Sequence, residues 1–195
     1  DRPDLRFGLE LVDLSSVVED SNFNIFSGTV ADGGVVKGLC LNDPKDYNRS
    51  QLDSLEDHAK DLGAKGLLWA NVGDDGLEGQ FTSHLSDETK ESIVDELDAE
   101  RGALVFMVAD SRDAANKVLG GLRMRLAEEN DLIPDDRWEF TWVRRFPLFG
   151  SDETGDITSE HHPFTSPRDE DVEKLSDQPL DVEAKAYDLV LNGIE

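Results

Sequence analysis

The strongest constraint on the fold is the uninterrupted apolar run at residues 103–109, Ala-Leu-Val-Phe-Met-Val-Ala. A strand with one face in water alternates apolar and polar side chains, whereas this run offers no polar side chain to either face. We therefore predict a central β-strand that is covered on both faces.

Three helices are predicted by apolar residues at helical spacing, and they cover residues 50–62, 86–97 and 111–129. Each starts with a serine, a residue type that caps helix N-termini: Ser50, Ser86 and Ser111. The third helix contains the pair Gly120-Gly121, although each glycine costs roughly 1 kcal/mol relative to alanine inside a helix. We expect a neighbouring element to pack closely against that pair.

Further strands are predicted by alternation or by short apolar runs, at residues 24–30, 35–41, 67–72, 138–146 and 187–191. The turn sequence Asp32-Gly33-Gly34 separates the first two strands, so we expect them to pair as a hairpin. A second, acidic hairpin tip is expected at residues 150–155, and a turn at Asn192-Gly193 is expected to close the last strand.

The charge of the chain is strongly acidic. Forty-four Asp and Glu residues oppose nineteen Lys and Arg residues, for a formal net charge of -25. Such a surface repels itself at low salt and is screened at high salt, where the Debye length is only ~3 Å at 1 M. Because the acidic residues are spread over nearly every segment, we expect a protein adapted to high internal salt. The same charge argues against tight, nonspecific binding of nucleic acid.

The remaining composition excludes other classes of protein. No apolar run approaches the ~20 residues that a membrane-spanning helix needs. The single Cys40 excludes an internal disulfide, and we expect it to be a packed small apolar residue. A cytoplasmic location fits these features.

Three segments resemble bacterial aspartyl-tRNA synthetases, which are class II enzymes. Residues 1–11, Asp-Arg-Pro-Asp-Leu-Arg-Phe-Gly-Leu-Glu-Leu, are similar to the stretch after the family's motif 2. Residues 101–149, from Arg-Gly-Ala-Leu to Phe-Pro-Leu-Phe, are similar to the exit from the family's inserted GAD domain. Residues 161–195, which include His-His-Pro-Phe-Thr-Ser-Pro and Ala-Tyr-Asp-Leu-Val-Leu-Asn-Gly, are similar to the second half of the catalytic core.

The resemblance implies an α+β fold with a two-layer antiparallel sheet and helices on one face, plus partial strands of a class II antiparallel core. It implies a core lead-in at residues 1–19, the GAD domain at 20–110, and an incomplete return into the catalytic core at 111–195. The chain would then be a fragment, with further catalytic motifs before residue 1 and after residue 195.

The family's reaction joins aspartate to ATP, releasing pyrophosphate, and then transfers the aspartyl group to tRNA. The resemblance implies that His161 and His162 bind the aspartate substrate, and that Glu195 contacts ATP through Mg²⁺. It also implies that the full-length parent enzyme uses ATP and Mg²⁺ and is a homodimer. Neither ATP nor Mg²⁺ is expected to be bound to the fragment. The fragment alone is expected to be inactive and to act as a module for the acceptor arm of tRNA.

Two positions depart from the family pattern. Arg145 stands where the family usually has Asp before Phe-Pro, and Gly150 stands where it usually has Glu after Leu-Phe. The first change reverses a charge near the substrate region. Without the family context, the histidine pair would be a solvated turn and the terminal glutamate an exposed residue.

Other constellations predict no site. His58 lies on an apolar helix face, and His84 has no partner at ligand spacing. The acidic clusters, at residues 74–75, 135–136 and 169–171, lack the alternating pattern of a calcium loop and are expected to be solvated surface. Two alternatives to the ligase fragment stay open: a GAD-type domain of a tRNA-dependent amidotransferase subunit, and a stand-alone acidic binding module.

Overall fold

The structure is a computed structural model that describes residues 3–152 and 154–194. It separates into two compact units. We call Gly8–Ile133 the sheet unit. We call the other the flanking unit, in which the N-terminal residues up to Phe7 join the chain from Pro134 onward.

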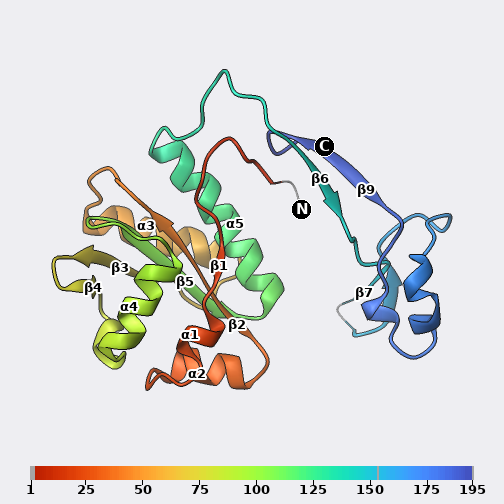
Figure 1. Ribbon diagram of the computed structural model, residues 1–195, viewed down its shortest axis with the longest axis horizontal. Helices are drawn as coiled ribbons and strands as arrows, with labels where there is room; N and C mark the ends of the chain where they lie inside the picture. The colour runs from red at the N-terminus through yellow and green to blue at the C-terminus, as the bar shows by residue number, and fades with distance from the viewer. Residues whose placement is uncertain (1–2, 153, 195) are drawn as a thin grey trace. The chain divides into compact units, whose positions relative to one another are not determined.

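The sheet unit is built on a five-stranded antiparallel sheet with the order β1-β2-β5-β3-β4 (Figure 1). The strands are β1 (Val12–Asp13), β2 (Val35–Leu41), β3 (Leu68–Gly73), β4 (Gly76–Glu78) and β5 (Leu104–Asp110). β5 is central, because it pairs with β2 through Leu39 and Phe106 and with β3 through Ala70 and Val105. Five consecutive residues of β5 are buried, so the predicted central strand is confirmed.

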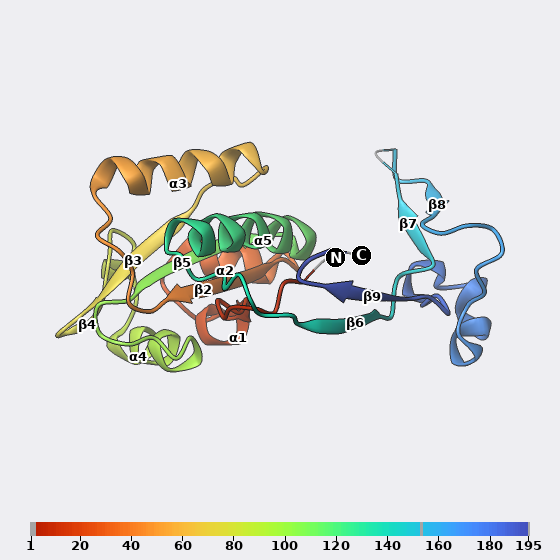
Figure 2. The same cartoon turned by 90° about the horizontal axis from the view of Figure 1, so that it is seen from above.

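Helices cover both faces of this sheet, α3 and α5 on one side and α1 and α4 on the other (Figure 2). On the first face, α3 (Arg49–Asp61) and α5 (Arg112–Glu129) bury leucines against Leu39 and Phe106. On the second, α1 (Ser15–Val18), α2 (Asn24–Ala31) and α4 (Asp87–Glu96) pack on Val105 and Met107. The α+β class and the antiparallel sheet are confirmed. The expectation of helices on one face is wrong, because β5 is apolar toward both sides.

Residues 24–30 form the helix α2, so the predicted strand and hairpin are wrong. The segment turns Phe26 into the core, where its ring meets the edges of Phe23 and Phe81 at centroid distances of 4.9 and 5.7 Å. Thr29 Oγ1 donates to the carbonyl of Ile25 at 2.7 Å, which satisfies its hydroxyl within the helix. The glycines that follow form the turn from this helix into β2 instead of a hairpin.

The helix caps agree in part with the sequence. Ser86 accepts from the amide of Thr89, and Ser111 accepts from that of Ala114, as predicted. Ser50 is not a cap. Asn48 caps α3 instead, accepting from the amide of Gln51, whose side chain accepts from the amide of Asn48 in return.

The sheet unit extends beyond residues 20–110 at both ends. α5 packs against β2 and β5 on one face of the sheet, and Leu14 and Val18 are fully buried in the core on the other face. The helix placed in the return segment and part of the lead-in therefore belong to this unit. In a small domain such elements are needed to cover the second face of each strand.

The flanking unit contains two short antiparallel ribbons and a small core. β6 (Phe140–Arg144) pairs with β9 (Tyr187–Leu191), and β7 (Phe149–Ser151) pairs with β8 (Ile157–Ser159). Leu148, Val182 and Ala184 form the core between them. The 3₁₀ helices η1 (Thr82–His84), η2 (Asp169–Leu175) and η3 (Pro179–Asp181) complete the two units. Within the described part of the chain, no helix combines the length and apolar character needed to cross a bilayer.

Candidate functional site

The ribbon of β6 and β9 carries an exposed apolar face. Trp142 pairs with Leu189, and Arg144 pairs with Tyr187, so these side chains share one face with Phe140 and Leu191. Phe140, Trp142 and Tyr187 are 60%, 52% and 68% exposed. A two-stranded ribbon is marginally stable alone. This exposure is consistent with a surface that further structure covers.

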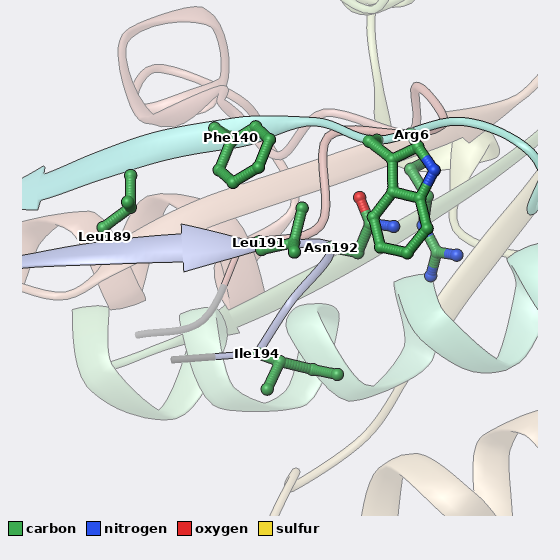
Figure 3. A pocket seen from close by; sticks show the side chains of 7 residues that line it. Arg6, Phe140, Leu189, Leu191, Asn192 and Ile194 are labelled. Carbon is green, nitrogen blue, oxygen red and sulfur yellow. The ribbon is translucent and has the colours of Figure 1, made fainter.

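One end of this face is hollowed. The cavity, of about 360 Å³, is lined by Arg6, Trp138, Phe140, Leu189, Leu191, Asn192 and Ile194. Figure 3 shows Phe140 and Leu189 projecting from the two strands, with Ile194 in the segment after β9. Asn192 closes the ribbon end: its side chain accepts from the amide of Glu139 and donates to the carbonyl of Arg137. The predicted turn at Asn192 is confirmed, with both Asn192 and Gly193 at positive φ.

The structure places His161 at the base of the β7–β8 hairpin, two residues after β8 ends at Ser159. The edge of its ring meets Phe146, with centroids 5.6 Å apart and planes at 79°. Its Nε2 atom is buried and has no hydrogen-bond partner among residues 3–152 and 154–194. A buried imidazole nitrogen normally has a partner. This atom is therefore the polar group of the loop best suited to meet a ligand or a water molecule.

His162 has a different environment from His161. It is exposed, and its Nδ1 accepts from the amide of Phe164 at 3.2 Å. Its ring meets Phe164, which is 90% exposed, at a centroid distance of 4.8 Å. The local hydrogen bond orients His162 and, among the residues that the structure describes, leaves its Nε2 available to an external group. The third predicted site residue, Glu195, lies outside the described residues.

The loop at residues 160–168, which carries both histidines and is called the histidine loop, is held at both ends. At its start, the amide of Glu160 donates to the carbonyl of Leu148 at 3.1 Å. At its end, the amide of Arg168 donates to the carbonyl of Glu183, and Arg168 Nη1 lies 2.9 Å from Glu183 Oε2. These contacts join the loop to the segment that leads into β9 and limit where the two imidazoles can lie.

A buried carboxylate stabilises the contacts at the end of the histidine loop. Asp171 accepts from Lys174 Nζ at 2.6 Å and from the amide of Glu183 at 3.1 Å. The hydrogen bond from Lys174, followed by that from the amide of Glu183, lowers the pKa of Asp171 below its ordinary value. We expected residues 169–171 to be solvated surface. That is wrong for Asp171, because it is buried and ion-paired.

Within the described ranges, no three His, Cys, Asp or Glu side chains gather as a metal site. The prediction that residues 74–75 are surface agrees with the structure, in which Asp74 is exposed and pairs with Arg101 at 2.9 Å. The sequence did not predict the ion pairs around Glu183, because its partners are distant in sequence. In so acidic a chain, the two adjacent arginines at 144–145 were the sequence feature that could have indicated a charged cluster in this region.

Comparison with known proteins identifies the sheet unit. The GAD domain family matches residues 26–119, which run from α2 into α5. Residues 26–119 are therefore similar to a GAD domain. The sheet unit that contains this match runs from Gly8 to Ile133.

The likeness to curated proteins extends beyond the GAD domain. The aspartate–tRNA(Asp/Asn) ligase of Halothermothrix orenii is 45% identical over 196 residues, covering 100% of this chain and 33% of that protein. The aspartate–tRNA(Asp/Asn) ligase of Caldanaerobacter subterraneus is 43% identical with the same coverage. The aspartate–tRNA ligase of Clostridium botulinum is 41% identical, again with 33% of its length covered. The chain therefore spans about a third of the relatives that it matches, and the resemblance to this family is confirmed.

Among solved structures, the hypothetical protein PH0730 from Pyrococcus horikoshii OT3 aligns with 52% of this chain and 56% of its own. The TM-score is 0.38 and the sequence identity is 18%.

Proposed function

We propose that this chain is the GAD-containing segment of an aspartate–tRNA ligase that is ATP-dependent and AMP-forming. The observation that carries the proposal is the identity of 45% over the whole chain, including both sides of the GAD domain. An isolated GAD domain of an amidotransferase subunit, or a stand-alone acidic module, would not need the flanking unit. The exposed apolar face of β6 and β9 supports a segment that joins a larger antiparallel sheet.

In this proposal the chain alone is inactive. The reaction needs aspartate, ATP and tRNA to be positioned together, because such enzymes act by orienting substrates and stabilising charge at the reacting phosphate. The described residues supply one side of an aspartate site, the loop with His161 and His162. His161 would place its buried Nε2 toward the substrate carboxylate, and His162 would flank it.

The fit of ATP and Mg²⁺ is limited. The described residues do not form a cluster of oxygen ligands that would hold Mg²⁺. Glu195, which we propose as the contact to ATP and its metal, lies outside them. We therefore assign ATP and Mg²⁺ to the parent enzyme.

The GAD domain would serve as the module that meets the acceptor arm of tRNA. A chain with a net charge of -25 attracts RNA poorly through long-range fields, so short-range contacts would have to carry this interaction. Titration of labelled tRNA at several salt concentrations tests the role. A dissociation constant that does not respond to changes in the acceptor arm would contradict it. We further propose a cytoplasmic, homodimeric parent, which sedimentation of the full-length protein would test.

The aspartate role of the histidines is tested by pyrophosphate exchange. In the full-length ligase that contains this chain, His161→Ala should raise the KM for aspartate by roughly tenfold or more, since a hydrogen bond to a charged group is worth about 1.5–3 kcal/mol. His58→Ala, which removes a half-buried histidine from the sheet unit, is the matched control and should leave KM unchanged. An unchanged KM for His161→Ala would refute the role, and aspartate-dependent exchange by the chain alone would refute its inactivity.

A further inference from the structure

Residues 182–185 of the flanking unit, which we call the bridging segment, join two other segments by backbone hydrogen bonds. On one side, the amide of Ala184 donates to the carbonyl of Phe146 at 2.7 Å. On the other side, the carbonyl of Glu183 accepts from the amide of Arg168 at 2.9 Å. The bridging segment therefore connects the residues between β6 and β7 to the end of the histidine loop.

Both of the segments that it joins bear on His161. The ring of Phe146 meets the edge of the His161 ring at a centroid distance of 5.6 Å, and Arg168 ends the loop that carries His161. The position of the bridging segment therefore determines how the His161 ring lies against Phe146. The direction of the buried Nε2 of His161 depends on that arrangement.

Asp171 holds the bridging segment in place. Its Oδ2 accepts from the amide of Glu183 at 3.1 Å, and its Oδ1 accepts from Lys174 Nζ at 2.6 Å. In the part of the chain that the structure describes, this carboxylate is the acceptor for the Glu183 amide. The amide of Asp171 also donates to the carbonyl of Arg168 at 3.0 Å. One residue thus holds both the end of the histidine loop and the bridging segment.

The burial pattern of η2 shows that Asp171 is placed for its hydrogen bonds. Asp171 is 4% exposed, whereas Val172 and Leu175 of the same helix are 49% and 37% exposed. Apolar burial alone would turn the valine and the leucine inward and leave the carboxylate in water. A buried carboxylate costs free energy unless hydrogen bonds and a cation offset that cost, and Glu183 and Lys174 supply them.

The side chain of Glu183 adds a weaker connection between the same segments. Arg168 Nη1 lies 2.9 Å from Glu183 Oε2, and Arg145 Nε lies 3.8 Å from the same oxygen. Arg145 directly precedes Phe146 and has a left-handed φ of 62°. Because these side chains are about one third exposed or more, we expect the ion pairs to contribute less than the buried carboxylate.

We propose that Asp171 is a positioning residue of the proposed aspartate site. By holding the amide of Glu183, it sets how His161 lies against Phe146 and thereby the direction of His161 Nε2. Asp171 acts through the bridging segment and not by contact with the substrate. Its effect on aspartate rests on the proposed function, whereas its effect on the His161 ring does not.

NMR of the chain tests the effect on His161. The ring protons of His161 and Phe146 should give a nuclear Overhauser contact, and those of Trp142 and Tyr187 give a reference contact in the same unit. Asp171→Ala should lose the first contact and keep the second. The Glu183 amide should then exchange with solvent at least about tenfold faster, because it loses a hydrogen bond to a charged group.

Two variants serve as controls for Asp171→Ala. Asp171→Asn retains an oxygen that can accept from the Glu183 amide, so it should keep both ring contacts. Glu173→Ala removes an exposed carboxylate from the same helix and should also keep both.

Pyrophosphate exchange by the full-length ligase that contains this chain tests the effect on aspartate. Asp171→Ala should raise the KM for aspartate at least about fivefold and change the KM for ATP less than about twofold. When His161→Ala is already present, Asp171→Ala should raise the KM for aspartate by less than about a further twofold. A residue that acts through another has little effect once that other residue is removed. Asp171→Asn and Glu173→Ala should each stay within about twofold of the unchanged enzyme.

Several outcomes would overturn the proposal. It fails if the unchanged chain lacks the contact between His161 and Phe146, or if Asp171→Ala keeps that contact. It also fails if Asp171→Ala loses both ring contacts, because the role of Asp171 would then be a general one in the fold. Additive effects of Asp171→Ala and His161→Ala on the KM for aspartate would overturn it as well. If neither variant changes that KM, the proposed aspartate site is refuted, and the ring contacts alone decide whether Asp171 positions His161.

Discussion

Gly121 of α5 lies directly against Leu62, the residue that ends α3. A β-carbon built on Gly121 would lie 2.5 Å from Leu62 Cδ1, closer than real β-carbons approach a neighbour. A β-carbon on Gly120 would meet no atom within 4 Å. The close packing predicted for the glycine pair is therefore confirmed for Gly121 and wrong for Gly120.

The two glycines should respond differently to alanine. Gly120→Ala should stabilise the chain by about 0.5–1 kcal/mol, because alanine has the higher helix propensity and the site has space. Gly121→Ala should gain less or destabilise, because Leu62 has to move. Urea unfolding of the two variants measures the difference. Equal stabilisation by both would contradict this prediction, because Leu62 would then move away from the added methyl group at no cost in free energy.

The cap of α3 makes a second matched pair. Asn48→Ala removes a capping box and should destabilise the chain by about 0.5–2 kcal/mol. Ser50→Ala changes an exposed residue inside the helix and should stay within about 0.5 kcal/mol. Thermal and urea unfolding of both variants would check this. A larger loss from Ser50→Ala than from Asn48→Ala would contradict the observed cap.

The Cys40 thiol should react slowly. Burial, followed by the negative charges of Asp98 and Glu100, raises its pKa from 9.0 to about 11. Only the thiolate reacts, so the rate with iodoacetamide at pH 8 should be about a hundredfold below that of an ordinary thiol. It should rise about tenfold per pH unit until the pH approaches 11. The urea-unfolded chain is the control and should react at the ordinary rate. Equal rates in the folded and unfolded chains would contradict the raised pKa.

Salt should stabilise the chain. A net charge of -25 repels itself, and raising salt from 0.1 to 1 M shortens the Debye length from ~10 to ~3 Å. We expect the melting temperature to rise by at least about 4 °C, equivalent to roughly 1–2 kcal/mol for a chain of this size. Most of the rise should occur below 1 M. A rise that begins only above 1 M would indicate salting out, and no rise would contradict adaptation to high salt.

Local sequence patterns predicted the strand that is buried on both faces and the helices whose apolar residues repeat at helical spacing. The apolar run of β5 admits only a strand covered on both faces, and the leucines of α3 and α5 repeat at helical spacing over several turns. α2 was mistaken for a strand because eight residues hold too few turns to show a period. Its state was decided by Phe26, which contacts Phe81 from a segment far along the chain.

The sequence by itself determined the relation to aspartate–tRNA ligases, the GAD domain and the central strand, because these depend on residue identity and local periodicity. Only the tertiary structure showed that, within the described residues, His161 has a buried, unpartnered nitrogen beside Phe146, and that Arg145 and Arg168 reach the same oxygen of Glu183. The physical reason is that those arrangements depend on the backbone of one left-handed residue and on the pairing of strands more than forty residues apart. No local sequence pattern predicts the left-handed residue or the strand pairing.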